Sequence, residues 1–577
     1  MAIPLSRFTF TCGPAPFFYI YPMADFDPQV AHPTLSAEQL GLLEPFGEVQ
    51  ATAPGDVLFR TGDTEYPWVV ILEGEVDIVS NIGEDTQGEV LATRHGGQFL
   101  GELSLLTGQT AFLMARVRTG GSVRIIPAVE LRQIVARVPQ LSELILNAFL
   151  LRREILQGNG AVAGLQIVGS RFSPDTQRLR AFAARNQLPH RWVDLEEDRG
   201  AESLLCAFGV QPEDTPIVIF QGREVLRNPS NGDLTRRLGL NRAVTSGEAV
   251  DLLVVGAGPA GLAAAVYGAS EGLNTLTLES ISTGGQAGTS SRIENYLGFP
   301  AGLSGAELAS RAVVQAQKFG ARIVVSRTAV QLRAEEDHFA VELDCDQCIQ
   351  ARSVIIATGA RYRKLPVPGL ETYEGRGVYY AATQTEARLC TGQDVVVVGG
   401  GNSAGQAAIF LSGAARHVYL LIRGKSLASS MSRYLIDRID RSPDITLLIH
   451  SEISELHGEQ QLTGITVVQN QTGDRQRLEA TNLFTFIGAD PYTDWLSGTL
   501  ALDAGGFILT GPLLRQSGKA AEVYAAANRD PFLLETSIPG VFAVGDVRSG
   551  STKRVATAVG EGSAAVKFVH EWLGLLQ

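Results

Sequence analysis

Two stretches of the chain share one pattern, a short apolar run followed by a glycine-rich turn and a segment that favours a helix. The first run covers 252–255, and the second lies within DVVVVGGG at 394–401. Apolar runs of this length without alternation are typical of parallel strands buried on both faces. Parallel strands need a crossover between them, usually a helix. The pattern therefore predicts two α/β units, each with a parallel sheet.

The N-terminal part of the chain has a different pattern. Between 31 and 157, short apolar stretches alternate with glycine turns and lead into a long amphipathic stretch, which predicts a small β-roll followed by a helix. Between 161 and 243 the order strand, helix, strand, helix, strand is predicted, with Thr215 and Pro216 before the last strand. We therefore expect a mostly-β domain and a small α/β domain ahead of the two larger units.

The first glycine turn carries the residues that a bound dinucleotide requires. In GAGPAG, Gly256 allows a tight turn, Gly258 lets the backbone approach a pyrophosphate, and Gly261 permits close packing of strand and helix. The helix that follows offers free amides and the positive end of its dipole to phosphates. Glu279 ends the next strand, where an acid can accept a ribose hydroxyl. This order predicts a dinucleotide site rather than a structural turn.

Composition narrows the classes of function. The chain has 577 residues, a formal charge of −13 and five cysteines. Its length predicts several domains, and its charge argues against nucleic acid or an anionic membrane surface as the main partner. No apolar run is long enough to span a bilayer, so no membrane partner is expected. The few cysteines predict a reducing, cytoplasmic compartment rather than a disulfide framework.

The first residues carry no pattern of regular structure. The run FFYIY at 17–21 is flanked by prolines and lacks the charged start and small-residue cleavage site of a signal peptide. We predict an N-terminal tail over 1–30, and we hypothesise that translation starts at Met23 rather than at Met1.

Residues 248–577 closely resemble the bacterial low-molecular-weight thioredoxin reductases. The resemblance is carried, in order, by GAGPAG (256–261), TGGQ (283–286), IIATGA (355–360), GGGNSA (399–404) and GVFAVGDV (540–547). It implies two Rossmann-like domains and a homodimer. The implied FAD-binding domain has two parts, 248–366 and 491–577, and an NAD(P)H-binding domain at 367–490 is inserted between them.

By this resemblance the first unit holds FAD. Gln286 and Asn295 would line the isoalloxazine pocket, and Asp546 would meet the ribityl chain. The full set that the resemblance assigns to FAD is Gly256, Gly258, Pro259, Ala260, Gly261, Glu279, Gly285, Gln286, Asn295, Thr358, Gly359, Gly545, Asp546, Arg554, Val555 and Ala556. The amides and dipole of the helix that follows GDV can stabilise negative charge on a reduced flavin.

The resemblance makes the second unit the nicotinamide-nucleotide site, and its residues are Gly399, Gly401, Asn402, Ser403, Ala404, Arg423, Lys425 and Arg433. Where the FAD unit has Glu279, this unit has Arg423, with Lys425 and Arg433 beyond it. An arginine there can bind the extra phosphate of NADPH, which an acid would repel. The family usually has a histidine and two arginines at this place, and this chain keeps one arginine. NADPH is predicted, with NADH as the alternative.

The redox tetrapeptide of the thioredoxin reductases is replaced. Their CATC sequence takes electrons from the flavin, and the matching residues here are Ala381, Ala382, Thr383 and Gln384. Alanine and glutamine cannot form a disulfide or a thiolate. We therefore predict no catalytic side chain of this kind and no classical disulfide reaction through this site.

The cysteines elsewhere give no clear substitute. Cys345 and Cys348 are predicted to flank a two-residue hairpin turn, where cross-strand partners could bridge, although a structural role is favoured. Cys206 and Cys390 are predicted to be core residues. Cys12 lies in the predicted tail. No metal site is expected.

Residues 31–157 resemble the cyclic-nucleotide-binding domains of bacterial activator proteins and of cyclic-AMP-dependent kinase regulatory subunits. The resemblance is strongest in GELSLL at 101–106, whose glutamate, here Glu102, binds the ribose in that family. The arginine that would grip the cyclic phosphate is replaced by Ala111. A buried phosphate without a cation is costly, although Arg116 or Arg118 could substitute. Cyclic-nucleotide binding stays an alternative for this domain, and a role as an orphan sensor or an assembly module is favoured over it.

Residues 161–243 resemble the thioredoxin and glutaredoxin fold. In that family a threonine-proline pair, here Thr215 and Pro216, is usually cis and faces a CxxC motif. The corresponding tetrapeptide here is Ser173, Pro174, Asp175, Thr176. Hydroxyl groups cannot carry a dithiol-disulfide cycle, so a scaffold or docking surface is predicted.

These features favour an FAD-dependent oxidoreductase that oxidises NADPH and passes electrons to an acceptor without an internal disulfide. The acceptor could be a quinone, oxygen, a one-electron protein carrier or an external disulfide. One alternative is a regulatory flavoprotein that senses NADPH or redox state with little turnover. A second is a ferredoxin-linked or external-disulfide reductase. The ferredoxin-linked members carry a C-terminal extension over the flavin, whereas this sequence ends soon after Trp572.

Overall fold

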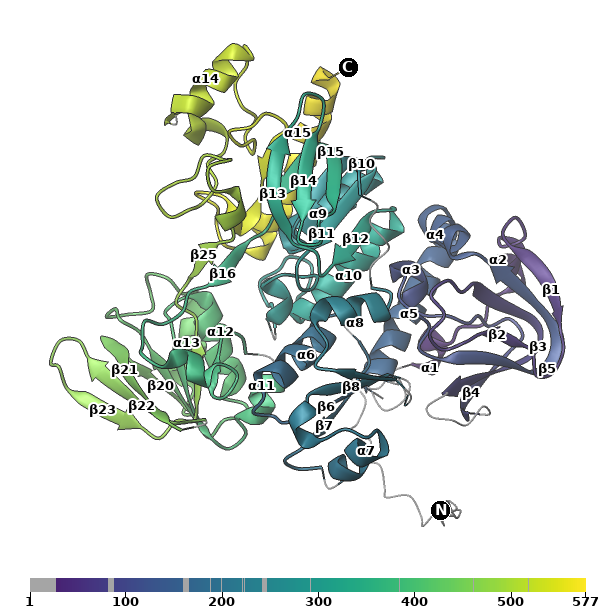
Figure 1. The fold of residues 1–577 in the computed structure, drawn as a ribbon, viewed down its shortest axis with the longest axis horizontal. Coiled ribbons are helices and arrows are strands. Elements are labelled where there is room, and N and C mark those ends of the chain that lie inside the picture. The colour runs from purple at the N-terminus through teal and green to yellow at the C-terminus, as the bar shows by residue number, and fades with distance from the viewer. Residues whose placement is uncertain are drawn as a thin grey trace, which may run out of the picture.

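The structure is a computed structural model. It describes residues 27–576, except 81–87, 159–164, 241–245 and positions 187, 199, 221, 223, 291, 383, 460 and 517. Most of the predicted 1–30 tail, with Cys12 and the proposed start at Met23, lies outside the described residues. Figure 1 shows a β-roll domain, a small central domain and two larger lobes, the second of which is inserted into the sequence of the first.

The β-roll domain begins earlier than predicted. Helix α1 (Pro28–Ala31) begins within the expected 1–30 tail and ends at Ala31, whose carbonyl accepts a hydrogen bond of 2.8 Å from Arg152 of the last helix. The strands are β1 (Glu48–Thr52), β2 (Val57–Phe59), β3 (Trp68–Ser80), β4 (Glu89–His95) and β5 (Met114–Ile126), in the order β1-β5-β3-β4 with β2 on β5. The other helices are α2 (Ala37–Gly41), α3 (Ser104–Thr107), α4 (Ala128–Arg137) and α5 (Pro139–Gly158). The rings of Trp68, Phe99 and Phe149 are fully buried at its centre.

Among the described residues, no single helix is long and apolar enough to cross a membrane. The pair formed by α4 and residues Pro139–Leu156 of α5 meets the length and composition criteria when taken together, with a bend of 120° between its halves.

The central domain has the predicted thioredoxin-like order. Its elements are β6 (Leu165–Gly169), α6 (Pro174–Arg185), β7 (Arg191–Asp194), α7 (Ala201–Ala207), η2 (Pro212–Asp214), β8 (Ile217–Phe220), β9 (Glu224–Arg227) and α8 (Asn231–Arg237). The sheet order is β7-β6-β8-β9, with β6 parallel to β7 and antiparallel to β8. The bond between Thr215 and Pro216 is cis, as predicted. Ser173 caps α6, and its hydroxyl accepts from the amide of Thr176.

The lobe predicted to bind FAD is built on a mostly parallel sheet. Its strands are β10 (Glu248–Val255), β11 (Thr275–Glu279), β12 (Arg322–Val325), β13 (Ala329–Ala334), β14 (Phe339–Leu343), β15 (Cys348–Ile356) and β26 (Val541–Ala543), in the order β12-β11-β10-β15-β14-β13 with β26 on β15. The helices are α9 (Pro259–Ser270), η3 (Ala287–Thr289), α10 (Gly305–Lys318), η5 (Asp494–Leu496), η6 (Gly511–Gln516), α14 (Gly518–Ala526), η7 (Gly545–Val547) and α15 (Val555–Leu575). The parallel strands end at one edge of the sheet, where ligands bind in folds of this type.

The nucleotide-binding lobe repeats this plan. Its parallel strands are β17 (Val378–Tyr379), β18 (Asp394–Val398), β19 (His417–Leu421), β20 (Ile445–Leu448) and β24 (Asn482–Thr485), in the order β17-β24-β18-β19-β20. An antiparallel sheet of β21 (Ser451–Gly458), β22 (Leu462–Gln469) and β23 (Arg475–Leu478) packs beside it, with helices η4 (Leu370–Tyr373), α11 (Gln384–Leu389), α12 (Asn402–Leu411) and α13 (Arg433–Arg441). Two paired strands, β16 (Ala360–Tyr362) and β25 (Ala489–Pro491), connect the two lobes.

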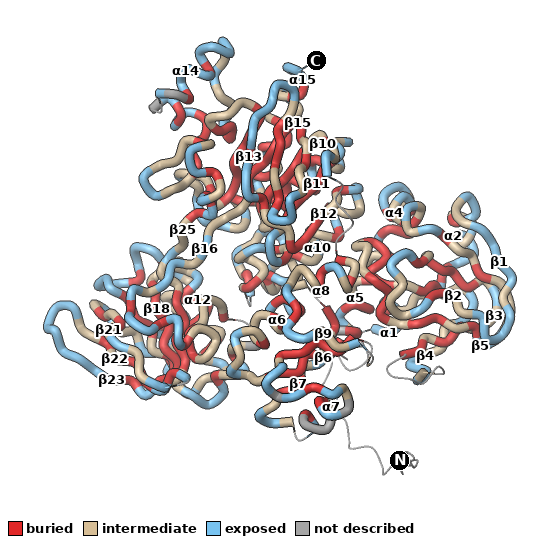
Figure 2. Tube along the Cα trace, in the orientation of Figure 1, coloured by how far each residue is buried: buried red, intermediate tan, exposed pale blue. Residues whose placement is uncertain are grey.

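The N-terminal domains pack against the FAD-binding lobe rather than extending away from it. Val314 of α10 belongs to the apolar core of the β-roll domain, and Phe112 and Val325 both belong to the core of the thioredoxin-like domain. Figure 2 shows the buried segments of these bodies in red. The β-roll domain, the thioredoxin-like domain and the FAD-binding lobe therefore share buried surface.

Candidate functional site

The first glycine turn follows β10 at the carboxyl edge of its sheet. Gly256 has a φ of +108°, and a Cβ there would lie 2.3 Å from the Ala357 carbonyl oxygen. A Cβ on Gly261 would lie 1.8 Å from the Gly256 oxygen, so both positions require glycine. Around Gly258 the space is open, because its Cβ would meet nothing closer than the Gly285 Cα at 3.9 Å. The start of α9 is thus open to a pyrophosphate.

Two carboxylates follow strands at this edge. The Glu279 carboxylate accepts hydrogen bonds from the amides of Ala257 at 2.8 Å and Ile281 at 3.0 Å. Burial raises the pKa of Glu279, and these amides oppose the rise. Burial also raises the pKa of Asp546, which accepts no hydrogen bond from the part of the chain that the structure describes. A partly buried acceptor without a protein donor fits a sugar hydroxyl, as a bound FAD would supply.

The other residues assigned to FAD surround the same turn or lie beyond it. The Gln286 amide donates to the Ala360 carbonyl, and the Thr358 hydroxyl donates to the Tyr492 carbonyl at 3.0 Å. These bonds fix the segment that enters β16. Asn295 is exposed, so its flavin contact stays a prediction. The remaining positions are Pro259 and Ala260 at the start of α9, the left-handed glycines Gly285, Gly359 and Gly545, and Arg554, Val555 and Ala556 at the start of α15.

The second glycine turn follows β18 and has the same design. Gly399 has a φ of +140°, and a Cβ there would lie 2.3 Å from the Phe486 oxygen. Gly401 has nothing within 4 Å of its Cβ position, which leaves the start of α12 open. The Asn402 amide donates to the Ser432 hydroxyl at 2.9 Å, and the Ser432 amide donates back at 2.7 Å. This fixes the start of α13 beside the turn, while Ser403 and the buried Ala404 continue α12.

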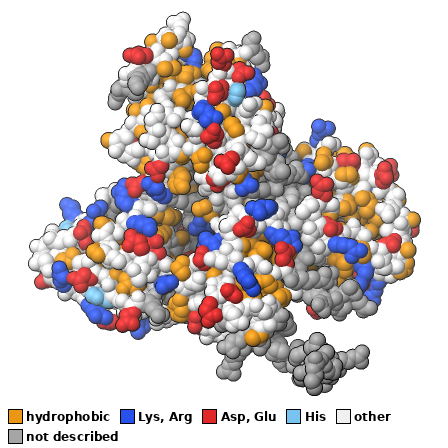
Figure 3. Space-filling model, in the orientation of Figure 1, with side chains coloured by type: hydrophobic (Ala, Val, Ile, Leu, Met, Phe, Trp, Pro, Cys, Tyr) orange, Lys and Arg blue, Asp and Glu red, His pale blue; other side chains and the backbone are white. Residues whose placement is uncertain are grey.

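The three predicted phosphate ligands are exposed cations. Arg423 and Lys425 follow β19, and Arg433 begins α13. Arg423 lies 3.8 Å from Glu452, and Arg433 lies 2.8 Å from Asp437, both in exposed pairs. Such pairs contribute little, so these cations can bind a phosphate, although Glu452 competes for Arg423. Charges of both signs are interspersed over the face in Figure 3.

The segment that replaces the redox tetrapeptide joins β17 to α11. Ala381 is half-buried and Ala382 is buried, Thr383 lies outside the described residues, and Gln384 begins α11. Just before it, the ring of Tyr380 stacks on that of Tyr362 of β16, with centroids 6.3 Å apart. An aromatic contact, with no thiol in it, therefore joins the two lobes here.

The structure corrects two predictions about cysteines. Cys206 was expected in the core, but it is exposed, because the buried face of the short helix α7 passes through Ala201 and Leu205. Cys345 and Cys348 are not cross-strand partners, because Cys348 pairs with Glu342 and Cys345 lies in the turn. Both are free thiols.

Cys390 is buried, as predicted. Burial, and then the charge of Glu386, raise the pKa of Cys390 to about 12. A thiol of this pKa forms little thiolate near neutral pH, and the thiolate is the reactive form. The described cysteine that follows Ala381 most closely in the chain is therefore unsuited to redox chemistry.

Comparison with known proteins identifies the larger part of the chain. Residues 250–562 match the model of the pyridine nucleotide-disulphide oxidoreductases, and residues 49–138 match the cyclic nucleotide-binding domain. The chain belongs to the pyridine nucleotide-disulphide oxidoreductase family. The thioredoxin reductase of Streptomyces clavuligerus is 34% identical over 327 residues, which cover 56% of this chain and 94% of that protein. An NADH dehydrogenase of Bacillus subtilis is 31% identical over 326 residues, with coverage of 56% and 59%.

A solved structure agrees with this assignment. The crystal structure of Lactococcus lactis thioredoxin reductase in the FR conformation matches with a TM-score of 0.50 and 28% identity, over 56% of this chain and 98% of that one. The protein is an NAD(P)H-dependent flavoprotein oxidoreductase that resembles thioredoxin reductase, with FAD and a nicotinamide nucleotide as its cofactors. The open glycine turns and the free Asp546 carboxylate fit these two ligands. The predicted multidomain fold class is confirmed.

Sequence reasoning missed the partner of Glu102. Arg153 of α5 donates from Nε at 3.0 Å and Nη2 at 2.7 Å to the Glu102 carboxylate, and from Nη1 to Gln109 at 2.8 Å. The Arg153 side chain is 3% exposed. Glu102 also accepts from the Ser104 amide at 3.0 Å. The carboxylate that would bind a ribose is thus already bound to a buried guanidinium.

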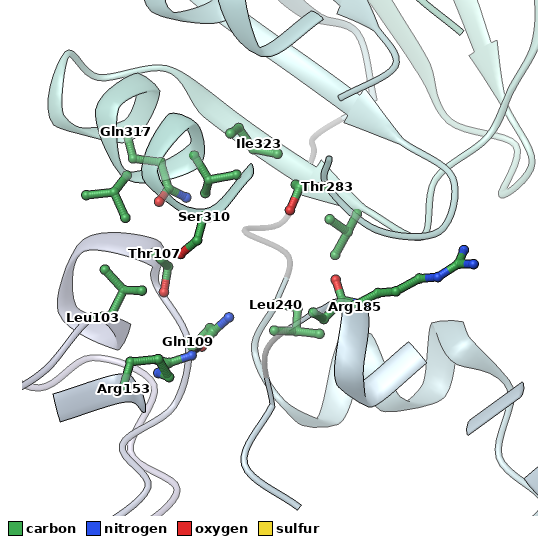
Figure 4. A pocket seen from close by; sticks show the side chains of 14 residues that line it. Leu103, Thr107, Gln109, Arg153, Arg185, Leu240, Thr283, Ser310, Gln317 and Ile323 are labelled. Atoms are coloured by element: carbon green, nitrogen blue, oxygen red, sulfur yellow. Dashed lines mark hydrogen bonds between the residues drawn. The ribbon is translucent and has the colours of Figure 1, made fainter. Parts of the chain in front are cut away.

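Arg153 also borders a cavity where three bodies meet. The cavity has a volume of about 70 Å³, and Figure 4 shows Arg153 and Gln109 on one side and Thr283 and Ile323 on the other. The hydroxyl of Thr107 and the amide oxygen of Gln317 line it without a hydrogen-bond partner among the described residues. A polar cavity of this size can hold several water molecules. Arg153 and Gln109, which are bonded around Glu102, and Thr283 of the TGGQ loop therefore border the same polar cavity.

Proposed function

We propose that the protein oxidises NADPH and passes the electrons to an acceptor without an internal redox disulfide. Bound FAD would supply the hydride and electron chemistry. The observation that supports the proposal is the pairing of open dinucleotide turns with Ala381 and Gln384 at the position of the CATC motif. Cys390, the described cysteine that follows this segment most closely in the chain, is buried, and its raised pKa disfavours the thiolate form.

Steady-state oxidation of NADPH in the presence of different acceptors tests this proposal. Protein loaded with FAD is mixed anaerobically with NADPH, and a panel of acceptors follows: a quinone, ferricyanide, oxygen and oxidised thioredoxin. We expect steady NADPH oxidation with at least one acceptor that is not a disulfide, and none with thioredoxin. Rapid thioredoxin reduction would contradict the proposal. Reduction of the protein by NADPH with no turnover on any acceptor would favour the regulatory alternative.

We expect faster reduction with NADPH than with NADH, because Arg423, Lys425 and Arg433 offer positive charge beyond β19. Replacing Arg423 by glutamine should raise the Kd for NADPH about tenfold or less, since an exposed cation is partly screened, and should leave the Kd for NADH unchanged. Stopped-flow reduction at varied nucleotide concentration measures both. Tighter binding of NADH by the wild-type protein would reverse the assignment.

We also propose that the β-roll domain is an assembly module that does not bind a cyclic nucleotide. The buried pair of Glu102 and Arg153 supports this, because a ribose would have to displace a guanidinium that makes several hydrogen bonds. Ala111, in place of the phosphate-binding arginine, is buried in the apolar core. Calorimetry with cyclic AMP and cyclic GMP should therefore give no heat of binding, and tight binding of either would contradict the proposal.

A further inference from the structure

The thioredoxin-like domain approaches one surface of the nucleotide-binding lobe, close to Ala381 in the chain. Helix α6 lies beside α11 in Figure 1. The Cγ of Gln177 on α6 is 3.8 Å from the position that a Cβ on Gly375 would take. Gly375 precedes β17, and α11 follows it. We call the surface made by Gly375, β17 and α11 the α6-facing surface.

Arg180 is the charged centre of this contact. Its guanidinium lies 3.6 Å from the centre of the Trp192 ring within its own domain. Burial lowers the pKa of Arg180, and across the contact the charge of Glu386 opposes this change while that of Arg388 adds to it. A partly desolvated cation feels nearby charges more strongly than one in water, because the effective dielectric constant is lower. Across the contact Glu386 therefore attracts Arg180 and Arg388 repels it, while Asp194 of its own domain attracts it more strongly than Glu386 does.

The contact lies near two positions where related proteins have redox cysteines and this chain has none. One is the CxxC position of the thioredoxin-like domain, and the other is the CATC position of the nucleotide-binding lobe. Gln177 directly follows Thr176, which stands in the position of the second CxxC cysteine. Thr176 is fully buried, and its hydroxyl has no hydrogen-bond partner among the described residues. On the other side, Ala381 and Ala382 lie in the chain between β17 and α11, the two elements of the α6-facing surface. Gln177, a residue next to the replaced CxxC position, thus lies against Gly375, which precedes the strand before the replaced CATC position.

The thioredoxin-like domain is itself held by the FAD-binding lobe. The hydroxyls of Thr235 and Ser326 are 2.7 Å apart and buried. Val325 lies in the core of the thioredoxin-like domain, and the Asn186 amide donates to the Ile281 carbonyl at 3.5 Å. The domain therefore moves with the FAD-binding lobe.

The nucleotide-binding lobe has a lighter attachment. The chain crosses between the lobes through β16 and β25, and a two-stranded link of this kind can act as a hinge. Arg438 and Glu294 form one exposed ion pair across the lobes, at 2.9 Å. The stack of Tyr380 on Tyr362 also joins the lobes at this link, and a contact with the thioredoxin-like domain would add a restraint on any swivel about it.

We propose that the thioredoxin-like domain is the resident partner of the nucleotide-binding lobe. Its helix α6 occupies the α6-facing surface, holds the lobe in one orientation and denies that surface to any free thioredoxin-fold protein. The domain therefore docks on the reductase as a thioredoxin would, but it has no CxxC motif and cannot carry out a dithiol-disulfide reaction. This inference does not depend on which acceptor takes the electrons from the flavin.

Hydrogen exchange of the full-length protein tests the inference. Peptides from α11 report the contact, and peptides from β8 report whether the thioredoxin-like domain stays folded. Arg180→Glu should speed exchange in α11 at least about tenfold, because Glu386 would then repel α6. Arg180→Met, which keeps packing over Trp192, should have a smaller effect. Adding Glu386→Arg to Arg180→Glu should restore slow exchange. Arg227→Glu is the matched control, as an exposed arginine on β9 of the same domain.

Small-angle scattering gives an independent result. The wild-type protein should keep one radius of gyration with and without NADPH, whereas Arg180→Glu should show a larger or NADPH-dependent value. Unchanged α11 exchange in Arg180→Glu with β8 protected, or an equal change in Arg227→Glu, would overturn the inference. If β8 loses protection in Arg180→Glu, the comparison rests on Arg180→Met, and unchanged α11 exchange there would overturn it.

Discussion

Gly261→Ala is expected to yield a folded protein that loses its FAD on gel filtration. The added Cβ would lie 1.8 Å from the Gly256 carbonyl oxygen, so the turn that faces the pyrophosphate must shift. Overpacking of this kind costs about 1–3 kcal/mol, and about 1.4 kcal/mol is a tenfold change in Kd. FAD affinity should therefore fall by about fivefold to 150-fold. The ratio of flavin absorbance to protein absorbance measures retention, and flavin fluorescence measures the Kd.

Gly560→Ala is the matched control. Gly560 lies within α15 of the same lobe, and a Cβ there meets nothing within 4 Å. This variant should bind FAD as the wild-type protein does, or should be slightly stabilised by the lower flexibility of its unfolded chain. Wild-type FAD affinity in Gly261→Ala would show that the turn does not hold the cofactor.

Arg153→Ala is expected to destabilise the β-roll domain by about 3–5 kcal/mol, because it leaves the buried Glu102 carboxylate without its cation. The amide of Ser104 would be the main donor left to that carboxylate. Urea denaturation followed by hydrogen exchange in β3 and β5 measures the loss. Adding Glu102→Gln to Arg153→Ala should recover part of it, since the uncompensated charge is then removed.

Arg118→Ala provides the comparison on the surface of the same domain. Arg118 is 58% exposed and lies 3.8 Å from Asp77, so its removal should cost at most about 1 kcal/mol. Equal losses of unfolding free energy for Arg153→Ala and Arg118→Ala would mean that the buried pair of Glu102 and Arg153 does not stabilise the domain more than an exposed ion pair does. Binding of a cyclic nucleotide by the wild-type protein would contradict the proposal that the pair of Glu102 and Arg153 prevents Glu102 from binding a ribose.

The two dinucleotide units could be predicted from the sequence because their signals are local. A buried strand, three glycines and a helix start lie within one short stretch, and the structure shows a steric reason directly for Gly256, Gly261 and Gly399. The replacement of CATC by Ala381 to Gln384 is equally local, because it needs only an alignment of neighbouring residues. Domain order followed from the change in pattern along the chain.

Long-range pairs could not be predicted in this way. Arg153 meets Glu102 across 51 positions of sequence, and no periodicity links them. Two adjacent arginines within the apolar stretch of α5 were the available signal, since buried charges need partners. The prediction that Cys206 lies in the core was wrong because it relied on the apolar neighbours of Cys206. The side of α7 on which its side chain lies depends instead on the helical phase. The contact between α6 and α11 joins two separately folded domains, which sequence pattern does not describe.

An anaerobic reductive titration tests the central claim most directly. FAD accepts two electrons, and a redox disulfide would accept two more, so the two designs differ in the NADPH that they consume. NADPH is added stepwise to the FAD-loaded protein while the flavin absorbance is recorded. We predict complete reduction at about one equivalent of NADPH per FAD, with no change in free thiols. A requirement for about two equivalents, with two new thiols per chain, would contradict the account.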